Sequence, residues 1–255
     1  MRGGITISIT LILLAVAAVF VGALMKSMFG FGEAIVSMPL LALLPIPLPT
    51  TVSLIGLAGL TVALLTVFGG WKHVERPVLI LLAVCTLIGI PGGLVLLQLA
   101  PAIVITSGLG IFLIAFGCYS FIKKSRSIDR PLLHHRGWVL PFGVASGMLG
   151  SAYNFNGVPI VVYGTLRQWT PERFRGTLQA HFLISGVLVV GGHALSGLWT
   201  FDALILYTYS LPAILAAAAL GVYVNKRIPA KRFEHYLFIM IIVLGFLLLV
   251  PRGSS

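Results

Sequence analysis

Long apolar runs with almost no charges dominate this chain and decide what it can fold into. Only 9% of its 255 residues are charged and 58% are hydrophobic, whereas a soluble domain carries about 25% charged residues. A run of about 20 apolar residues is long enough to cross a bilayer as a helix. The runs are continuous rather than alternating, which favours helices over a β-barrel. The sequence therefore predicts an all-α polytopic membrane protein with about 8–10 membrane helical segments.

Two of the apolar segments are too short to cross a bilayer as helices. These two, 33–45 and 157–166, each follow a longer segment after a polar, Gly-rich break. We therefore predict that 5–45 and 137–166 are paired units, each a broken or re-entrant helix pair that enters the membrane and returns. The full set of predicted segments is 5–27, 33–45, 51–70, 77–99, 101–122, 137–152, 157–166, 177–198, 203–224 and 236–250.

The basic residues test this pairing. Lys and Arg number 17 against 6 Asp and Glu, which gives a net charge of +11. If each paired unit returns to its starting side, the basic loops fall on one face, and an excess of Lys and Arg marks that face as cytoplasmic. The charge then needs no nucleic-acid partner; the expected partners are the lipid bilayer and a small anionic substrate. The expected location is the cell inner membrane, with multiple passes. The basic loops are Lys72/Arg76, Lys123 to Arg136, Arg167 to Arg175 and Lys226 to Arg232.

This topology divides the chain into two inverted repeats. The first repeat, 1–122, starts outside and the second, 137–250, starts inside, with 123–136 as a basic cytoplasmic linker. Inverted repeats with broken helices are typical of secondary transporters, whose sites lie where the broken helices meet. Residues 249–254, Leu-Val-Pro-Arg-Gly-Ser, match a thrombin site, so we treat 251–255 as the remnant of an expression tag.

The motifs at the two breaks resemble the sulfite exporter TauE/SafE family, also called toluene sulfonate uptake permeases. The resemblance covers most of the chain, including the helix spacing. It implies a transporter of small sulfur-containing anions such as sulfite, sulfoacetate or another sulfonate. The residues that carry it are Phe29-Gly30-Phe31-Gly32-Glu33, Ser37-Met38-Pro39-Leu40-Leu41, Asn156-Gly157-Val158-Pro159-Ile160-Val161-Val162-Tyr163, Leu166-Arg167 and Phe174-Arg175-Gly176-Thr177-Leu178.

Most candidate substrate-binding residues lie in the breaks. Glycines there permit unusual backbone conformations, and helices that begin after them aim free N–H groups at an oxyanion; close helix packing is the alternative role. Polar side chains in the second break can bind an anion or satisfy the broken backbone. Arg175 and Gln179 share one helix face, and Arg175 is either an anion clamp or an interfacial arginine. The candidates are Phe29, Gly30, Phe31, Gly32, Tyr153, Asn154, Asn156, Gly157, Arg175 and Gln179.

Three ionisable residues are candidates for proton coupling or gating. Glu33 is the carboxylate expected at membrane depth, where it must be protonated or paired. It is therefore either a proton site or the structural partner of Lys26. Lys26 can supply positive charge to an anion or extend to the interface. His193 can relay protons or hydrogen-bond between helices.

Two other functions compete with a carrier. An anion channel can share the same repeats. An intramembrane serine hydrolase is suggested by Ser146 and His193, but the spacing around Ser146 does not fit that of a rhomboid protease. We therefore expect no enzymatic activity and no catalytic residue. No metal or cofactor is expected, and the chain lacks the phosphate-binding loop of an ATP-driven pump. A homodimer stays open as an oligomeric state.

Overall fold

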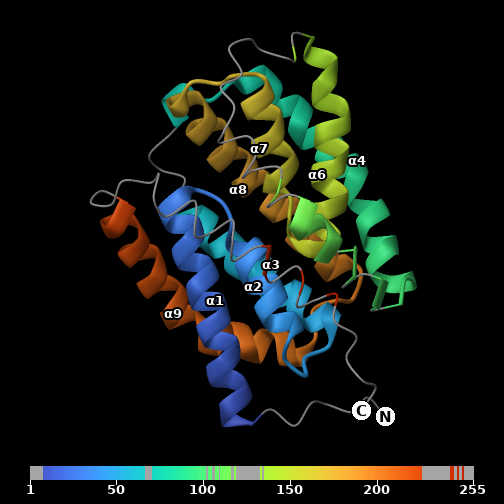
Figure 1. Cartoon of the computed structure of the whole chain (residues 1–255), viewed down its shortest axis with the longest axis vertical. Coiled ribbons are helices and arrows are strands. Elements are labelled where there is room, and N and C mark those ends of the chain that lie inside the picture. The colour runs from blue at the N-terminus through green and yellow to red at the C-terminus, as the bar shows by residue number, and fades with distance from the viewer. Residues whose placement is uncertain are drawn as a thin grey trace.

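The fold is known from a computed structural model, drawn in Figure 1. It describes residues 8–66, 71–101 and 135–225, together with Leu133 and positions 103–104, 107–108, 110–115, 118, 242–243, 246 and 249. The described residues form helices and loops and contain no strand, so the predicted all-α class is confirmed. The predicted linker 123–136, the segment 236–250 and the tail 251–255 lie largely or wholly outside the described residues.

Five of the described helices are long and apolar enough to cross a membrane. They have 19 to 25 residues each. Four begin and end within a few residues of the predicted segments, whereas α8 begins at Pro171 rather than at residue 177. The five are α1 (Ile9–Phe29), α3 (Leu48–Thr66), α4 (Arg76–Leu99), α8 (Pro171–Leu195) and α9 (Phe201–Asn225).

Three shorter helices complete the two predicted paired units. In the first unit α1 is followed by α2 (Glu33–Ala42), and in the second α6 (Val139–Tyr153) is followed by α7 (Gly157–Leu166). Both α2 and α7 have 10 residues and bury most of their side chains. A broken backbone is tolerated at membrane depth only where protein surrounds it, and this burial provides that surrounding. Two short 3-10 turns, η2 (Trp71–His73) and η3 (Arg136–Trp138), precede α4 and α6.

The packing of the helices has a repeated pattern. The most extensive contacts are those of α1 with α9 and of α4 with α6, while α3 and α8 pack against each other between them (Figure 1). Each of the more extensive contacts among these eight helices has a counterpart when α1, α2, α3 and α4 are exchanged with α6, α7, α8 and α9. This pattern is what two repeats would produce; their inverted orientation across a membrane stays a prediction.

Small residues allow the closest helix pairs to form. A Cβ atom added at Gly147 of α6 would collide with the carbonyl oxygen of Thr86 on α4. A Cβ atom at Gly22 would likewise collide with Ser37, whose hydroxyl donates to the carbonyl oxygen of Ala18 at 3.0 Å. Glycine at such contacts is common in membrane helices because it lets the backbones approach.

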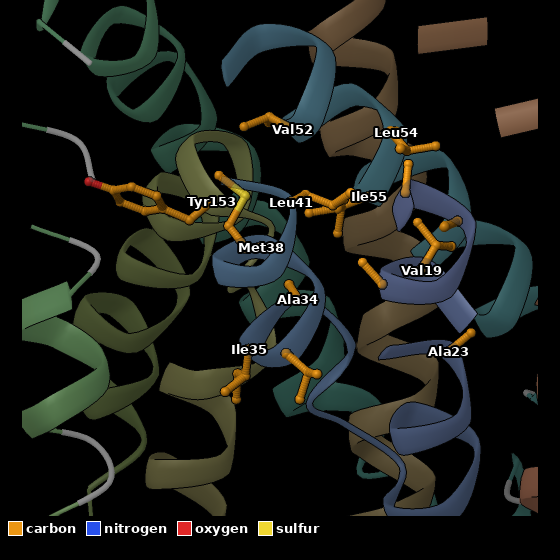
Figure 2. Close-up of a cluster of buried hydrophobic side chains, with 14 of the residues drawn as sticks. Val19, Ala23, Ala34, Ile35, Met38, Leu41, Val52, Leu54, Ile55 and Tyr153 are labelled. Atoms are coloured by element: carbon orange, nitrogen blue, oxygen red, sulfur yellow. The ribbon is translucent and has the colours of Figure 1, made fainter. Parts of the chain in front are cut away.

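The larger of two apolar cores surrounds α2. It takes side chains such as Val19 from α1, Met38 and Leu41 from α2, and Ile55 from α3 (Figure 2). Because α2 is enclosed, its first residue, Glu33, is held inside the protein rather than at its surface.

Contacts between the two halves occur at both ends of α3. Near its N-terminus, the hydroxyl oxygens of Thr50 and Thr200 lie 3.1 Å apart, and Ser53 donates to the carbonyl oxygen of Leu198 at 2.8 Å. Beyond its C-terminus, Glu75 meets Arg167. The structure thus brings together loops that the charge pattern assigns to one face. Which face is cytoplasmic stays a prediction.

Candidate functional site

The first break reverses the chain through two glycines. Gly30 has φ +82° and Gly32 has φ +99°, which are values that L side chains rarely adopt. The N–H of Gly30 donates to the carbonyl oxygen of Lys26 at 2.7 Å and closes the end of α1. The reversal places the start of α2 beside the end of α1.

The second break uses asparagine for the same purpose. Asn154 has φ 59°, and asparagine is one of the few residues that adopt this conformation readily. Its N–H donates to the carbonyl oxygen of Gly150 at 2.8 Å. Ser146 donates to the carbonyl oxygen of Asn156 at 2.6 Å, which secures the loop that leads into α7.

The two breaks line a common cavity. Its walls come from the end of α1, from both breaks and from the middle of α3 and α8. The volume is about 40 Å³, and since one water molecule needs about 10–15 Å³, a few waters or a small ion can fit. The lining residues are Lys26, Phe31, Gly32, Glu33, Ala34, Ile35, Ile55, Gly56, Gly59, Leu60, Asn154, Phe155, Asn156, Gly157, Val158, Phe182, Gly186, Val189 and Val190.

Both half-helices begin at this cavity without a side-chain cap. Neither Gly32 before α2 nor Asn156 before α7 provides a capping hydrogen bond. By contrast, Ser8 and Thr170 cap α1 and α8 with their hydroxyl oxygens. An uncapped N-terminus keeps the positive end of the helix dipole and any N–H groups that have no other partner. Free N–H groups lie mainly at the start of α2, because at the start of α7 Pro159 has no N–H and Val158 donates to the carbonyl oxygen of Phe155 at 3.2 Å. Two such termini at one cavity form an environment suited to an anion.

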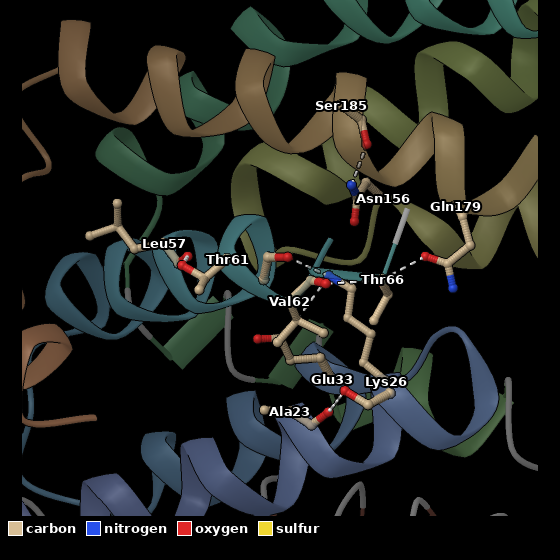
Figure 3. A network of polar contacts seen from close by, with 12 residues as sticks. Ala23, Lys26, Glu33, Leu57, Thr61, Val62, Thr66, Asn156, Gln179 and Ser185 are labelled. Atoms are coloured by element: carbon tan, nitrogen blue, oxygen red, sulfur yellow. Dashed lines mark hydrogen bonds and ion pairs between the residues drawn. The ribbon is translucent and has the colours of Figure 1, made fainter. Parts of the chain in front are cut away.

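A buried ion pair forms part of the cavity wall. The Nζ atom of Lys26 lies 3.0 Å from Oε2 of Glu33, and the two side chains are only 7% and 5% exposed. Nζ also donates to the carbonyl oxygen of Gly59 at 2.7 Å and lies 5.0 Å from the centre of the Phe182 ring. Figure 3 shows Lys26 and Glu33 directed toward each other. The second carboxylate oxygen, Oε1, is buried and has no hydrogen-bond partner among the described residues.

The asparagines of the second break are hydrogen-bonded to α3 and α8. Nδ2 of Asn154 donates to the carbonyl oxygen of Val52 at 2.7 Å. Nδ2 of Asn156 donates to the hydroxyl of Ser185 at 2.5 Å (Figure 3). Each amide keeps a second N–H, because an amide nitrogen carries two. The cavity thus has a charged pair on one side and neutral amides on the other.

Other predicted site residues lie around the cavity rather than on its wall. Gln179 lies over the first break, where its Nε2 would meet a Cβ at Gly30 at 3.2 Å. His193 lies behind Gly56 and donates from Nε2 to the carbonyl oxygen of Ser151 at 2.9 Å. Arg175 is exposed near the start of α8. Those that line the cavity are Phe31, Gly32, Glu33, Lys26, Asn154, Asn156 and Gly157, and those that do not are Phe29, Gly30, Tyr153, Arg175, Gln179 and His193.

Several residues of the site escaped the sequence analysis. Gly59 contributes only its backbone carbonyl, and Phe182 and Ser185 lie within the apolar run of α8. Phe182 and Ser185 are three residues apart, so they share one helix face. The structure shows that this face packs against the second break, where Phe182 contacts Gly157 and Ser185 bonds to Asn156.

Two features of the described residues bear on enzymatic alternatives. Ser146 bonds to the Asn156 carbonyl and His193 to the Ser151 carbonyl, so neither side chain has the other as its hydrogen-bond partner. A nucleophilic serine needs its base within hydrogen-bond reach. Among the described residues no group of three His, Cys, Asp or Glu could hold a metal ion.

A family comparison decides the relationship of this chain. The model of the family described as sulfite exporter TauE/SafE matches residues 14–248, nearly the whole chain. The chain belongs to the sulfite exporter TauE/SafE family. This confirms the resemblance seen at the breaks, and with the five long apolar helices it makes the chain a multi-pass membrane protein. Membership in a transporter family agrees with the expectation that the chain is not an enzyme. No curated protein and no solved structure matches the chain.

Proposed function

We propose that this chain is a secondary transporter that moves a small sulfur-containing anion across the cell inner membrane by alternating access. The observation that carries the proposal is the meeting of two uncapped helix N-termini and a buried lysine at one cavity. Free backbone N–H groups and a cation are the donors that a sulfite or sulfonate group requires. Membership in the sulfite exporter TauE/SafE family supports a sulfur-containing anion as the cargo.

The size of the cavity supports a small cargo. A volume of about 40 Å³ suits sulfite or the head group of a short sulfonate such as sulfoacetate. Gly32 in the first break keeps part of this space open, whereas Gly157 in the second break lets the Phe182 ring approach the start of α7. A Cβ atom at Gly32 would meet nothing within 4 Å, so a larger residue there would extend into unfilled space.

Contacts between the halves support a carrier rather than an open pore. On α3 the cavity residues run from Ile55 to Leu60, and the contacts of Thr50 and Ser53 lie on one side of them. Glu75, which follows α3 on the other side, pairs with Arg167 at 3.7 Å and with Arg173 at 3.9 Å. In alternating access these two sets of contacts would open in turn.

The pair of Lys26 and Glu33 is our proposed site of proton coupling. An ionised carboxylate beside the site repels an anion, so protonation of Glu33 favours anion binding, and anion binding favours protonation by the same factor. His193 is retained as a candidate relay because it lies directly behind the cavity. A homodimer is compatible with this scheme, which does not require one.

Counterflow in proteoliposomes tests the proposal. Vesicles loaded with unlabelled sulfite should accumulate labelled sulfite transiently, with a rate that saturates as its concentration rises. An anion channel would instead give currents far above carrier turnover and no counterflow. Absence of both would refute transport of this anion class.

A further inference from the structure

The charge inside the cavity sets a condition on its cargo. Among the described residues that line the cavity, Lys26 and Glu33 are the titratable side chains. The facing residues of the second break are neutral amides, and α3 contributes Gly59 and other uncharged residues. On α8, Nε2 of His193 donates to the carbonyl oxygen of Ser151 and Nε2 of His181 lies 3.2 Å from Oγ1 of Thr86, while Nδ1 of each ring is buried without a hydrogen-bond partner among the described residues. Neither histidine lines the cavity. The ionised pair therefore leaves the empty cavity with no net side-chain charge.

An anion that enters this neutral cavity adds a buried negative charge. Such a charge is costly in a membrane protein unless another charge compensates it. Lys26 is already paired with Glu33 at 3.0 Å, so it can compensate the anion fully only when the carboxylate loses its own charge. A proton bound to Glu33 achieves this.

The position for that proton is open. Oε2 of Glu33 accepts from Lys26, whereas Oε1 is buried without a hydrogen-bond partner among the described residues. A proton on Oε1 turns this oxygen into a donor beside the cavity. It can then bond to an oxygen of the anion, in the same way as the free N–H groups at the start of α2.

We infer that the site takes one singly charged oxyanion together with one proton, which Oε1 of Glu33 receives from water as the anion binds. This inference rests on the proposed function and adds the charge of the cargo. The charges of Lys26, protonated Glu33 and a monoanion sum to zero, and so do the charges of the ionised pair in the empty site. Both the loaded and the empty site then carry no net charge while access alternates between the two sides of the membrane. A dianion would leave one negative charge uncompensated.

Methanesulfonate and sulfate form a matched pair of probes. They have the same number of non-hydrogen atoms, and methanesulfonate keeps a single charge across neutral pH while sulfate keeps two. In proteoliposomes a pH gradient of one unit, acidic outside, should drive about tenfold accumulation of methanesulfonate. An imposed potential of about 60 mV should leave that accumulation unchanged, whereas transfer of one net charge would change it about tenfold.

Variants of the pair test the role of Glu33. In the unmodified protein, above the pH at which the empty site takes up its proton, methanesulfonate affinity should fall about tenfold per pH unit. Glu33→Gln should bind with an affinity independent of pH and lose accumulation driven by the pH gradient. Glu172→Gln, which removes an exposed carboxylate, should behave as the unmodified protein. The double variant Lys26→Gln/Glu33→Gln leaves no unpaired charge, so it should fold even if Glu33→Gln does not, and it should lose tenfold or more in affinity.

The outcomes separate this inference from the proposed function. If the unmodified protein binds and transports no sulfur oxyanion, the proposed function fails. If it transports them but takes sulfate as readily as methanesulfonate, or if accumulation follows the potential tenfold, only the inference of a monoanion with one proton is overturned. Unchanged affinity in the double variant would also overturn it.

Discussion

Replacing Gly157 by alanine should displace the ring that faces Lys26. Gly157 is the first residue of α7, and a Cβ atom there would lie 2.5 Å from Cε1 of Phe182 and closer still to Cζ. Ordinary contact between carbon atoms needs about 3.5 Å, so the ring must withdraw by about 1 Å or more. Its face lies 5.0 Å from Nζ of Lys26, and the movement therefore changes how the ammonium group is held.

The cost should resemble that of overpacking a core, about 1–3 kcal/mol. Phe182 is 6% exposed and packs with Ile160, Tyr163 and Leu178 in the second apolar core, so it has little room to move. Thermal unfolding of the purified protein should show a lower midpoint for Gly157→Ala. Methanesulfonate binding, followed by titration calorimetry, should weaken in the same variant.

Two further variants make this prediction refutable. Gly191→Ala lies on α8, where an added Cβ meets nothing within 4 Å, and alanine should stabilise the helix by up to about 1 kcal/mol. Gly157→Ala/Phe182→Leu removes the ring and should recover most of the lost stability. Equal unfolding midpoints and equal methanesulfonate affinities in Gly157→Ala and Gly191→Ala would show that the Phe182 ring does not lie against Gly157.

Three more predictions follow from the breaks and the ends of the fold. Gly32→Leu should abolish transport while the protein still folds, because the leucine side chain would enter unfilled space in the cavity. The φ of +99° at this position adds about 1–2 kcal/mol of strain to the variant. Retained transport would show that the substrate binds elsewhere. Glu75→Gln removes the carboxylate that pairs with two arginines. In a protein with both native cysteines replaced, Glu75→Gln should speed the labelling of a cysteine at Ala34 from the cytoplasmic side about two- to fivefold, since such an ion pair contributes up to about 1 kcal/mol. An unchanged labelling rate would show that the ion pairs of Glu75 do not act as a gate. A cysteine at Ser127 should react only from the cytoplasm and one at Thr200 only from outside, and labelling of both from one side would contradict the inverted repeats.

The fold was largely predictable because hydrophobicity alone marks membrane helices. The two short helices, α2 and α7, begin at Glu33 and Gly157, where the Gly-rich breaks predicted them. The predicted apolar segment 177–198 begins six residues after the start of α8, because the first turns of that helix are polar, with Thr170 as the N-cap and Pro171 as the first residue. An apolar run cannot mark a helix that extends beyond the hydrocarbon region, whereas the capping residues can.

The candidate site was only partly predictable. Glycines and charges in apolar surroundings identified Lys26, Gly32 and Glu33, because such residues are costly at membrane depth without a purpose. Arg175, which was predicted from the helix face that it shares with Gln179, is exposed and does not line the cavity. Phe182 could not be found, since an aromatic residue in an apolar helix has no distinguishing signal until its neighbours in space are known.

Anion-dependent thermal unfolding tests the central claim, an anion site between the two breaks, most directly. Methanesulfonate at 100 times its dissociation constant should stabilise the folded protein by about 2.7 kcal/mol. We predict that the unfolding midpoint rises with methanesulfonate concentration in the unmodified protein and in Gly191→Ala, and stays constant in Gly32→Leu. A constant midpoint in the unmodified protein, or an equal rise in Gly32→Leu, would contradict an anion site at this cavity.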